Sequence, residues 1–168
     1  MIELDSIFSI SNDQEFESKA LEIYKFQREN CFVYREYLSI LNRPEPTCLE
    51  EIPFLPISFF RTHQVIMQGK NAKKIFKSSG TTDSDRSQHF ISDISIYQNS
   101  FEYSYRKFIG NPEEQVILAL LPNYLEQGDS SLVYMVDHLI NQTNNPLSGF
   151  LLGDFSVVHQ RYQKAVES

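Results

Sequence analysis

The stretch Gln115-Val116-Ile117-Leu118-Ala119-Leu120-Leu121-Pro122 decides the fold class of this chain. Its apolar residues follow one another without a polar interruption and stop at a proline, which is the pattern of a strand buried on both faces. Strands of that kind belong to parallel sheets that carry helices on each side. The stretch therefore predicts an α/β fold built around a largely parallel sheet.

Segments of alternating type surround this strand, because short β-like runs and longer helical patterns follow one another. The predicted strands are residues 63–68, 74–77, 89–91, 115–122 and 149–153, and the predicted helices are residues 93–108, 130–141 and 156–167. Ser130 or Ser131 is the expected cap of the second helix. The first two helices each have an apolar face that we expect to pack in the core. These faces are formed by Tyr97, Phe101, Tyr105 and Phe108, and by Leu132, Met135, Val136 and Leu139.

The first third of the chain has a different pattern. Residues 13–41 carry apolar side chains at helical spacing and predict one long helix or two shorter ones. Prolines in residues 43–61 then prevent a long helix, although the stretch 52–57 is too apolar for an exposed linker. We therefore expect a single α/β unit over residues 1–168. It would comprise a helical segment over 1–42, a proline-rich strap over 43–61 packed on the core, and an α/β part over 62–168.

The charge and the composition exclude several classes of protein. The 22 acidic residues against 15 basic ones give a net charge of −7, whereas a nucleic-acid binder carries a basic face. The acidic N-terminus differs from a secretion signal, and no apolar run has the ~20 residues of a membrane span. Cys31 and Cys48 lack the spacing of a metal site or a disulfide framework. The sequence thus predicts a cytoplasmic protein with no nucleic-acid partner, no membrane span and no protein-built metal site, and with Cys31 in the core.

A hydroxyl-rich loop comes directly after the predicted strand 74–77. Lys77-Ser78-Ser79-Gly80-Thr81-Thr82 combines four hydroxyl side chains with a glycine, and Arg86 adds a second positive charge. Backbone N–H groups in a turn that Gly80 allows converge on one anion. The candidates for holding the triphosphate of ATP, with Mg²⁺ sharing its charge, are Ser78, Ser79, Gly80, Thr81, Thr82 and Arg86. The residues alone leave a second interpretation, a solvated turn, because the GxxxxGK[ST] pattern is missing.

The loop resembles the phosphate loop of the acyl-adenylate-forming superfamily. That pattern is roughly [ST][SG]G[ST][TSE]GxPK, and Asp83, Asp85 and Arg86 stand at its glycine, proline and lysine. The chain is more similar to the LuxE-type acyl-protein synthetases of this superfamily, a phenylacetate-CoA ligase-like group that keeps SSGTT and relaxes the GxPK part of the pattern. Three further stretches resemble segments of the same family: residues 52–60, 122–126 and 128–135. The resemblance spans about residues 50 to 155.

The resemblance implies an enzyme that activates a carboxylic acid, with a fatty acid expected. In this family the acid attacks the α-phosphate of ATP, pyrophosphate leaves, and the acyl group passes from acyl-AMP to a thiol. The thiol of a LuxE-type enzyme is a cysteine of its own, which hands the acyl group to a reductase partner. The resemblance also implies that this chain is the N-terminal portion of a longer adenylate-forming enzyme. Two alternatives stay open: an acyl-CoA ligase that uses free coenzyme A, and a non-catalytic interaction module that keeps the fold.

The four histidines lie outside these motifs. His63 and His89 flank the loop in sequence, and we interpret both as partly exposed structural residues. The alternative for His89 is a position on the ligand side of the loop. His138 and His159 are expected at the surface.

Overall fold

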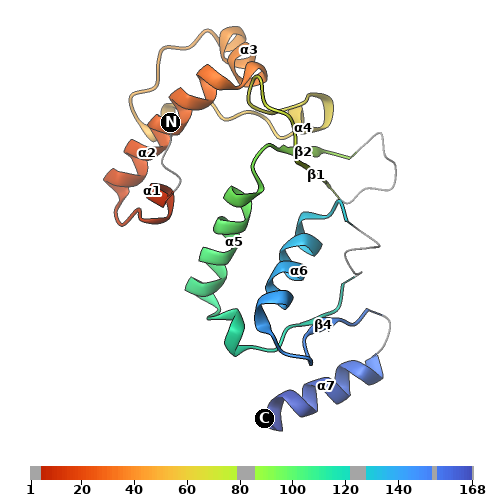
Figure 1. Cartoon of the computed structure of the whole chain (residues 1–168). Coiled ribbons are helices and arrows are strands. Elements are labelled where there is room, and N and C mark those ends of the chain that lie inside the picture. Colours follow the sequence, from red (N-terminus) through yellow and green to blue (C-terminus); the bar gives the residue numbers. More distant parts are fainter. Residues whose placement is uncertain (1–4, 79–85, 122–127, 153–154, 168) are drawn as a thin grey trace. The chain divides into compact units, whose positions relative to one another are not determined.

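The computed structural model describes residues 5–78, 86–121, 128–152 and 155–167 (Figure 1). Contacts divide the chain into two compact units, Met1–Ile96 and Tyr97–Ser168. The fold is α/β, with helices and two small sheets. The expectation of a single α/β unit over the whole chain stays a prediction.

Consecutive helices form much of the first unit. A short helix, α1 (Asp5–Phe8), precedes α2 (Asp13–Asn30), and α3 (Phe32–Leu41) begins after one intervening residue. The Asn12 side chain caps α2, because it accepts a hydrogen bond from the Glu15 N–H at 2.9 Å. Of the two predictions for residues 13–41, two shorter helices is therefore the correct one.

The helical segment breaks at Cys31 because this residue pairs with a distant part of the chain. Its backbone is extended, with φ −108° and ψ 109°, and it forms an isolated antiparallel bridge with Met67. The Gln68 N–H donates to the Asn30 carbonyl at 2.7 Å. The strand predicted over residues 63–68 is therefore wrong. Only Met67 joins a bridge, and its partner is a helix junction that offers no further ladder.

The core of the first unit lies between these helices and the proline-rich strap. Tyr24, Cys31, Tyr34 and Ile52 are buried together, which confirms the prediction for Cys31. The Tyr34 hydroxyl donates to the Pro53 carbonyl at 2.6 Å and so ties the strap to α3. The core thus joins segments from three separate stretches of sequence.

The strap packs on this core only in part. Ile52, directly after η1 (Leu49–Glu51), is buried and Leu55 packs beside it. Phe54 and Ile57 are 73% and 78% exposed. The expectation that the apolar run packs on the core is thus wrong for Phe54 and Ile57. A proline-rich extended chain repeats every three residues, so only every third side chain faces the same way.

An antiparallel hairpin completes the first unit. β1 (Lys74–Lys77) pairs with β2 (Gln88–Ile91), and Lys77 stands opposite Gln88. The short helix α4 (Phe59–Thr62) contacts β2. Both strands confirm their predicted positions on either side of the hydroxyl-rich loop.

The second unit contains a strand–helix–strand arrangement. β3 (Leu118–Ala119) and β4 (Gly149–Phe150) pair in parallel, and α6 (Ser131–Thr143) lies between them in sequence. The Leu151 N–H extends the pairing by donating to the Ala119 carbonyl at 2.8 Å. Parallel strands require a crossover of this kind, since a tight turn can only join antiparallel neighbours.

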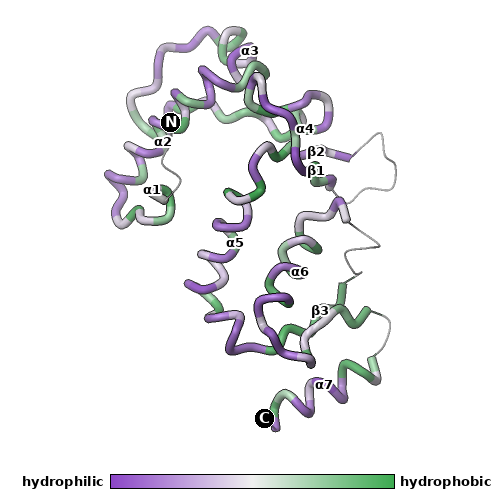
Figure 2. Tube along the Cα trace, in the orientation of Figure 1, coloured by the Kyte–Doolittle hydropathy of each residue, from purple (hydrophilic) through white to green (hydrophobic). Residues whose placement is uncertain are grey.

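The apolar run that predicted the fold class forms a shorter strand than expected. In Figure 2 the apolar residues of this run are green, at and beside the label β3. Ala119 is buried, but Leu120 is 50% exposed. A strand that is buried on both faces needs neighbours on both edges, and the described residues give β3 only β4 as a partner. Among the described residues the sheets are therefore one antiparallel pair and one parallel pair, not one largely parallel sheet.

Two helices flank these strands in sequence, where the patterns predict them. They are α5 (Ile94–Phe108) and α7 (Phe155–Glu167). Phe101 is buried as expected, whereas Phe108 is 76% exposed. The prediction for Phe108 is wrong because α5 ends there and the chain turns away at Gly110, whose φ is +131°.

At the start of α6 the residue that faces inward is Val133, one position after the predicted Leu132. Ser130 caps the helix, since its Oγ accepts the Val133 N–H at 3.4 Å. Val133 and Leu139 are buried, whereas Leu132 is 47% exposed. Neighbouring apolar residues at the start of a helix fit the same periodicity, so only tertiary packing decides which of them turns inward. No helix within the described ranges is both long enough and apolar enough to cross a membrane.

Candidate functional site

The hydroxyl-rich loop connects β1 to β2. The structure describes the base of the loop, which consists of Ser78, Arg86 and Ser87. Residues 79–85 lie outside the described residues, so the predicted contacts of Ser79, Gly80, Thr81 and Thr82 stay predictions. At the base, the Ser78 N–H donates to the Ser87 carbonyl at 3.0 Å. The Ser87 N–H donates in return to Ser78 Oγ at 2.9 Å. Two hydrogen bonds thus extend the hairpin by one further residue pair.

Arg86 closes the same base from the other side. Its Nε donates to the Ser78 carbonyl at 2.6 Å, a short charge-assisted hydrogen bond. This contact holds the two ends of the loop together. It gives Arg86 a structural role, while its predicted contact with phosphate stays a prediction.

Helix α4 lies against the strand that leaves the loop. The rings of Phe60 and His89 stack with centroids 4.4 Å apart and planes at 21°. Burial lowers the pKa of His89 below its ordinary value. A histidine with a lowered pKa is neutral at pH 7. The interpretation of His89 as a partly exposed structural residue agrees with this packing, because its ring fixes α4 to β2.

A small pocket of about 190 Å³ opens between α4 and β2. It is lined by Phe60, Arg61, Thr62, His63, Gln64, Gln88 and Phe90. The side chains of Arg61, Gln64 and Gln88 make no hydrogen bond or ion pair within the described residues. No carboxylate lines the pocket. The pocket therefore presents to solvent a positive charge and hydrogen-bond donors that no other described residue uses.

A chain of aromatic contacts runs from the core to this pocket. Tyr34 and Tyr37 stack at 6.5 Å, and Tyr37 meets Phe59 edge-on at 5.5 Å. Phe59 in turn stacks on His63 at 4.9 Å with planes at 22°. Contacts between ring faces and edges are directional, so they fix the orientation of the imidazole as well as its position.

His63 makes a further contact with the end of α4. Its Nδ1 lies 2.8 Å from Thr62 Oγ1, which lies 3.4 Å from the Ser58 carbonyl. Within the described part of the chain, Nε2 of His63 has no hydrogen-bond partner. The expectation of a partly exposed histidine is confirmed, although the sequence did not reveal that His63 lines a pocket with Arg61.

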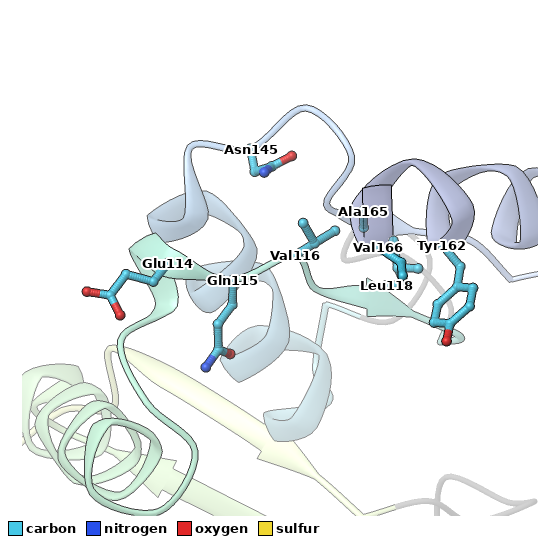
Figure 3. Close-up of a pocket in the computed structure, with 8 residues that line it drawn as sticks. All are labelled: Glu114, Gln115, Val116, Leu118, Asn145, Tyr162, Ala165 and Val166. Atoms are coloured by element: carbon cyan, nitrogen blue, oxygen red, sulfur yellow. The ribbon is translucent and has the colours of Figure 1, made fainter. Parts of the chain in front are cut away.

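The second unit has a larger pocket, of about 540 Å³ (Figure 3). The segment before and through β3 lines one part with Glu114, Val116 and Leu118, and α7 lines another with Tyr162 and Val166. Figure 3 shows the Glu114 carboxylate on the opposite side from Tyr162. Its lining contains no histidine, cysteine or cationic side chain. Its titratable lining groups, Glu114 and Tyr162, lie on opposite sides of the pocket, and the lining has no cation that could hold an anion.

His138 is partly exposed, and it makes a contact between helices that the sequence did not predict. Its Nε2 lies 2.5 Å from Glu102 Oε1, and the side chains of the two residues are only 27% and 29% exposed. Glu102 belongs to α5, so this contact joins α5 to α6. The two helices also meet where Gln98 Nε2 donates to the Tyr134 hydroxyl at 2.8 Å. No sequence signal pairs residues this far apart. His159 is exposed, as predicted.

The two cysteines are poorly suited to accept an acyl group. Cys31 is 2% exposed. Partial burial raises the pKa of the Cys48 thiol, as do its hydrogen bond with Glu50 and the nearby carboxylates. A thiol with a raised pKa provides little thiolate at pH 7. In the described ranges, no three His, Cys, Asp or Glu side chains gather as a metal site requires.

Comparison of the chain with protein-family models, with curated proteins and with solved structures finds no match in any of the three. The sequence patterns and the geometry of the described residues are therefore the basis of the functional proposal.

Proposed function

We propose that this chain carries the ATP-phosphate loop of an adenylate-forming enzyme of LuxE type, which activates a carboxylic acid, most simply a fatty acid. The observation that carries the proposal is the SSGTT sequence at the turn of a hairpin with a hydrogen-bonded base. Ser78, Ser87 and Arg86 hold the two ends of the loop together. A loop with fixed ends loses less conformational entropy when it closes on a ligand.

The proposed reaction has two steps. A carboxylate oxygen attacks the α-phosphorus of ATP, a P–O bond forms, and pyrophosphate leaves with its electron pair. A thiol sulfur then attacks the acyl carbon, a thioester forms, and AMP leaves. In the first step the hydroxyl groups of residues 78–82 and the N–H groups of residues 79–82 would hold the β- and γ-phosphates together with Mg²⁺. Donors positioned in advance stabilise the charge that develops in the transition state.

The proposal includes a parallel sheet with more strands than the pair of β3 and β4. In an adenylate-forming domain, β3, α6 and β4 would be one strand–helix–strand unit within a sheet of more strands. The short parallel pair supports this assignment, because parallel sheets are normally covered by helices on both faces and rarely consist of two strands.

The acyl acceptor, in this proposal, is neither Cys31 nor Cys48. The burial of Cys31 and the raised pKa of Cys48 support that statement. The acceptor is then another thiol, either a cysteine outside this chain or that of coenzyme A. A LuxE-type enzyme and an acyl-CoA ligase differ at this point. Retention of a labelled acyl group on the protein after denaturation distinguishes them.

Acid-dependent exchange of pyrophosphate into ATP tests the first step. The exchange is measured on the complete gene product with carboxylic acids from acetate to myristate. We expect exchange with at least one acid and its loss in Gly80→Val, since a Cβ blocks the turn that Gly80 permits. Far-UV circular dichroism of the variant checks that it remains folded. Exchange with none of the acids contradicts the proposed activity, and exchange unaffected by the substitution contradicts the role of the loop.

A further inference from the structure

We propose that the pocket between α4 and β2 binds the carboxylate group of an organic acid, with Arg61 as the principal contact and His63 and Gln88 as further donors. This assignment deepens the proposed function, because it gives the acid a position. Only the statement that the bound acid is the substrate rests on the proposed function, and the binding of a carboxylate does not. The pocket itself lies entirely within described residues of the first unit.

The charges around the pocket favour an anion. Arg61 is exposed and has no ion-pair partner within the described residues, although the chain has 22 acidic residues for 15 basic ones. A pocket that Arg61 lines and that no carboxylate lines is complementary to an anion.

The hydrogen-bond donors of the pocket match a carboxylate. Arginine presents a planar pair of N–H groups that fits the two oxygens of such a group. The amides of Gln64 and Gln88 supply neutral N–H donors, and neither is used by another described residue. Nε2 of His63 is the ring nitrogen that remains for a ligand, and it donates in the tautomer in which Nδ1 accepts from Thr62 Oγ1. The group that satisfies these donors has acceptors only, as an ionised carboxylate does.

The size and the apolar walls of the pocket favour a carboxylate over a phosphate group. Arg61 is the one permanent charge among the lining residues, which suits a monoanion. The rings of Phe60 and Phe90 also line the pocket, and hydrocarbon next to an acid group would pack on them. A volume of about 190 Å³ is below the range of about 300–1,000 Å³ that whole drug-sized ligands occupy. The pocket thus fits the head group and first carbons of an acid.

Aromatic contacts on two sides hold the helix that frames the pocket. Phe59 and Phe60 are neighbours in α4, yet Phe59 contacts Tyr37 and His63 while Phe60 stacks on His89. The helix is therefore fixed both to α3 and to β2. A site that is held in place before binding loses less entropy when the ligand arrives.

Titration of the 168-residue chain with hexanoate, followed by calorimetry and by ¹H–¹⁵N amide shifts, tests the proposal. We expect saturable binding in the roughly millimolar range, which a small acid held by one charged contact attains. Hexan-1-ol has the same hydrocarbon without the charge, and inorganic phosphate has charge without the hydrocarbon. We expect no saturable binding of the alcohol and at least about tenfold weaker binding of phosphate.

Two matched variants locate the site. Arg61→Gln removes the charge from the pocket, and we expect it to weaken hexanoate binding about tenfold or more. Arg43→Gln removes the same charge at an exposed residue after α3, and we expect affinity within about twofold of the wild type. Equal effects of the two substitutions would show general electrostatic attraction and overturn the proposal. Absence of saturable hexanoate binding, or phosphate binding as tight as hexanoate binding, would overturn it as well.

The outcome is separable from that of the proposed function. If the complete gene product exchanges pyrophosphate but Arg61→Gln leaves the KM for the acid unchanged, the pocket assignment is wrong and the adenylation proposal stands. If hexanoate binds through Arg61 but no acid supports exchange, the pocket assignment stands and the adenylation proposal is wrong.

Discussion

The two units of this chain differ in the balance of contacts that hold their elements together. In the first, aromatic rings connect α3 to α4 through Tyr37 and Phe59, and Phe60 on His89 connects α4 to the hairpin. In the second, α5 and α6 are joined by aromatic contacts, Tyr97 with Tyr134 and Phe101 with His138, and also by several polar side chains. The Tyr97 hydroxyl donates to the Ser131 carbonyl at 3.0 Å, and further contacts join Gln98 to Tyr134 and Glu102 to His138.

The two kinds of contact differ in how much stability is lost when one of them is removed. Buried rings stabilise through contact area and dispersion, so removing one leaves a cavity and a large loss of stability. Half-exposed polar contacts exchange with water, so removing one changes the free energy of unfolding much less. We therefore expect the loss of one buried ring in the first unit to cost more stability than the loss of one polar contact between α5 and α6.

The largest expected effect is that of Tyr34→Ala. Tyr34 is buried, contacts the rings of Tyr24 and Tyr37, and holds the strap through the Pro53 carbonyl. We expect a loss of about 3–5 kcal/mol in the free energy of unfolding, measured by urea denaturation with far-UV circular dichroism. Phe108→Ala, at an exposed aromatic residue, is the control and should change stability by less than about 0.5 kcal/mol. Similar losses in both variants would remove the basis of the comparison.

A smaller effect is expected at alkaline pH. Burial, with smaller contributions from Tyr24 and Tyr37, raises the pKa of Tyr34 from 10.0 to about 12. The folded state therefore holds this proton more tightly than the unfolded state. The resulting stabilisation is complete below pH 10 and is lost as the pH rises toward 12.

Tyr34→Phe isolates this contribution. Between pH 10 and pH 12 the wild type should lose roughly 1 kcal/mol more than the variant. This is less than the about 2 kcal/mol that full linkage would give over the same range, because solvent screens part of the effect. Burial also raises the pKa of Tyr97 and of Tyr105. Both residues are present in wild type and variant, so their contributions cancel. Parallel pH profiles would contradict the assigned role of Tyr34.

The smallest effect is expected for the contact between Glu102 and His138. A double-mutant cycle with Glu102→Gln and His138→Gln should give a coupling free energy of about 0.5–1 kcal/mol, because both side chains are partly exposed. The coupling is measured at pH 6 and should shrink at high salt, which screens an ion pair of this kind. A coupling above about 3 kcal/mol would mean that the second unit also depends on single contacts.

Elements with strong local signals could be predicted from sequence. The helices α5, α6 and α7 and the strands β1 and β2 lie within a few residues of their predicted positions. Periodicity, a serine cap and a hydroxyl-rich turn act over short distances along the chain, so they are visible without the fold. The strand expected over residues 63–68 failed because its partner is a helix junction far away in sequence.

The candidate site also has one part that the sequence predicted and one part that it did not. The loop is visible as a run of residue types, whereas the pocket of Arg61, His63 and Gln88 depends on the placement of α4 against β2. The FFRTH stretch that supplies α4 contains an arginine and a histidine two residues apart, and this was the only local signal. The contact of Glu102 with His138 left no signal of this kind, because the two residues belong to different helices.

Local sequence patterns were sufficient to predict the α/β class, the positions of most helices, the two strands on either side of the hydroxyl-rich loop and the burial of Cys31. The antiparallel pairing of those two strands came only from the structure. Tertiary structure alone decided that Val133 and not Leu132 faces inward, that the strap packs through Ile52 but not Phe54, and that the apolar run forms a two-residue strand. Local patterns record which side chains avoid water. Which of several apolar residues is covered, and by what, depends on partners that are distant in the chain.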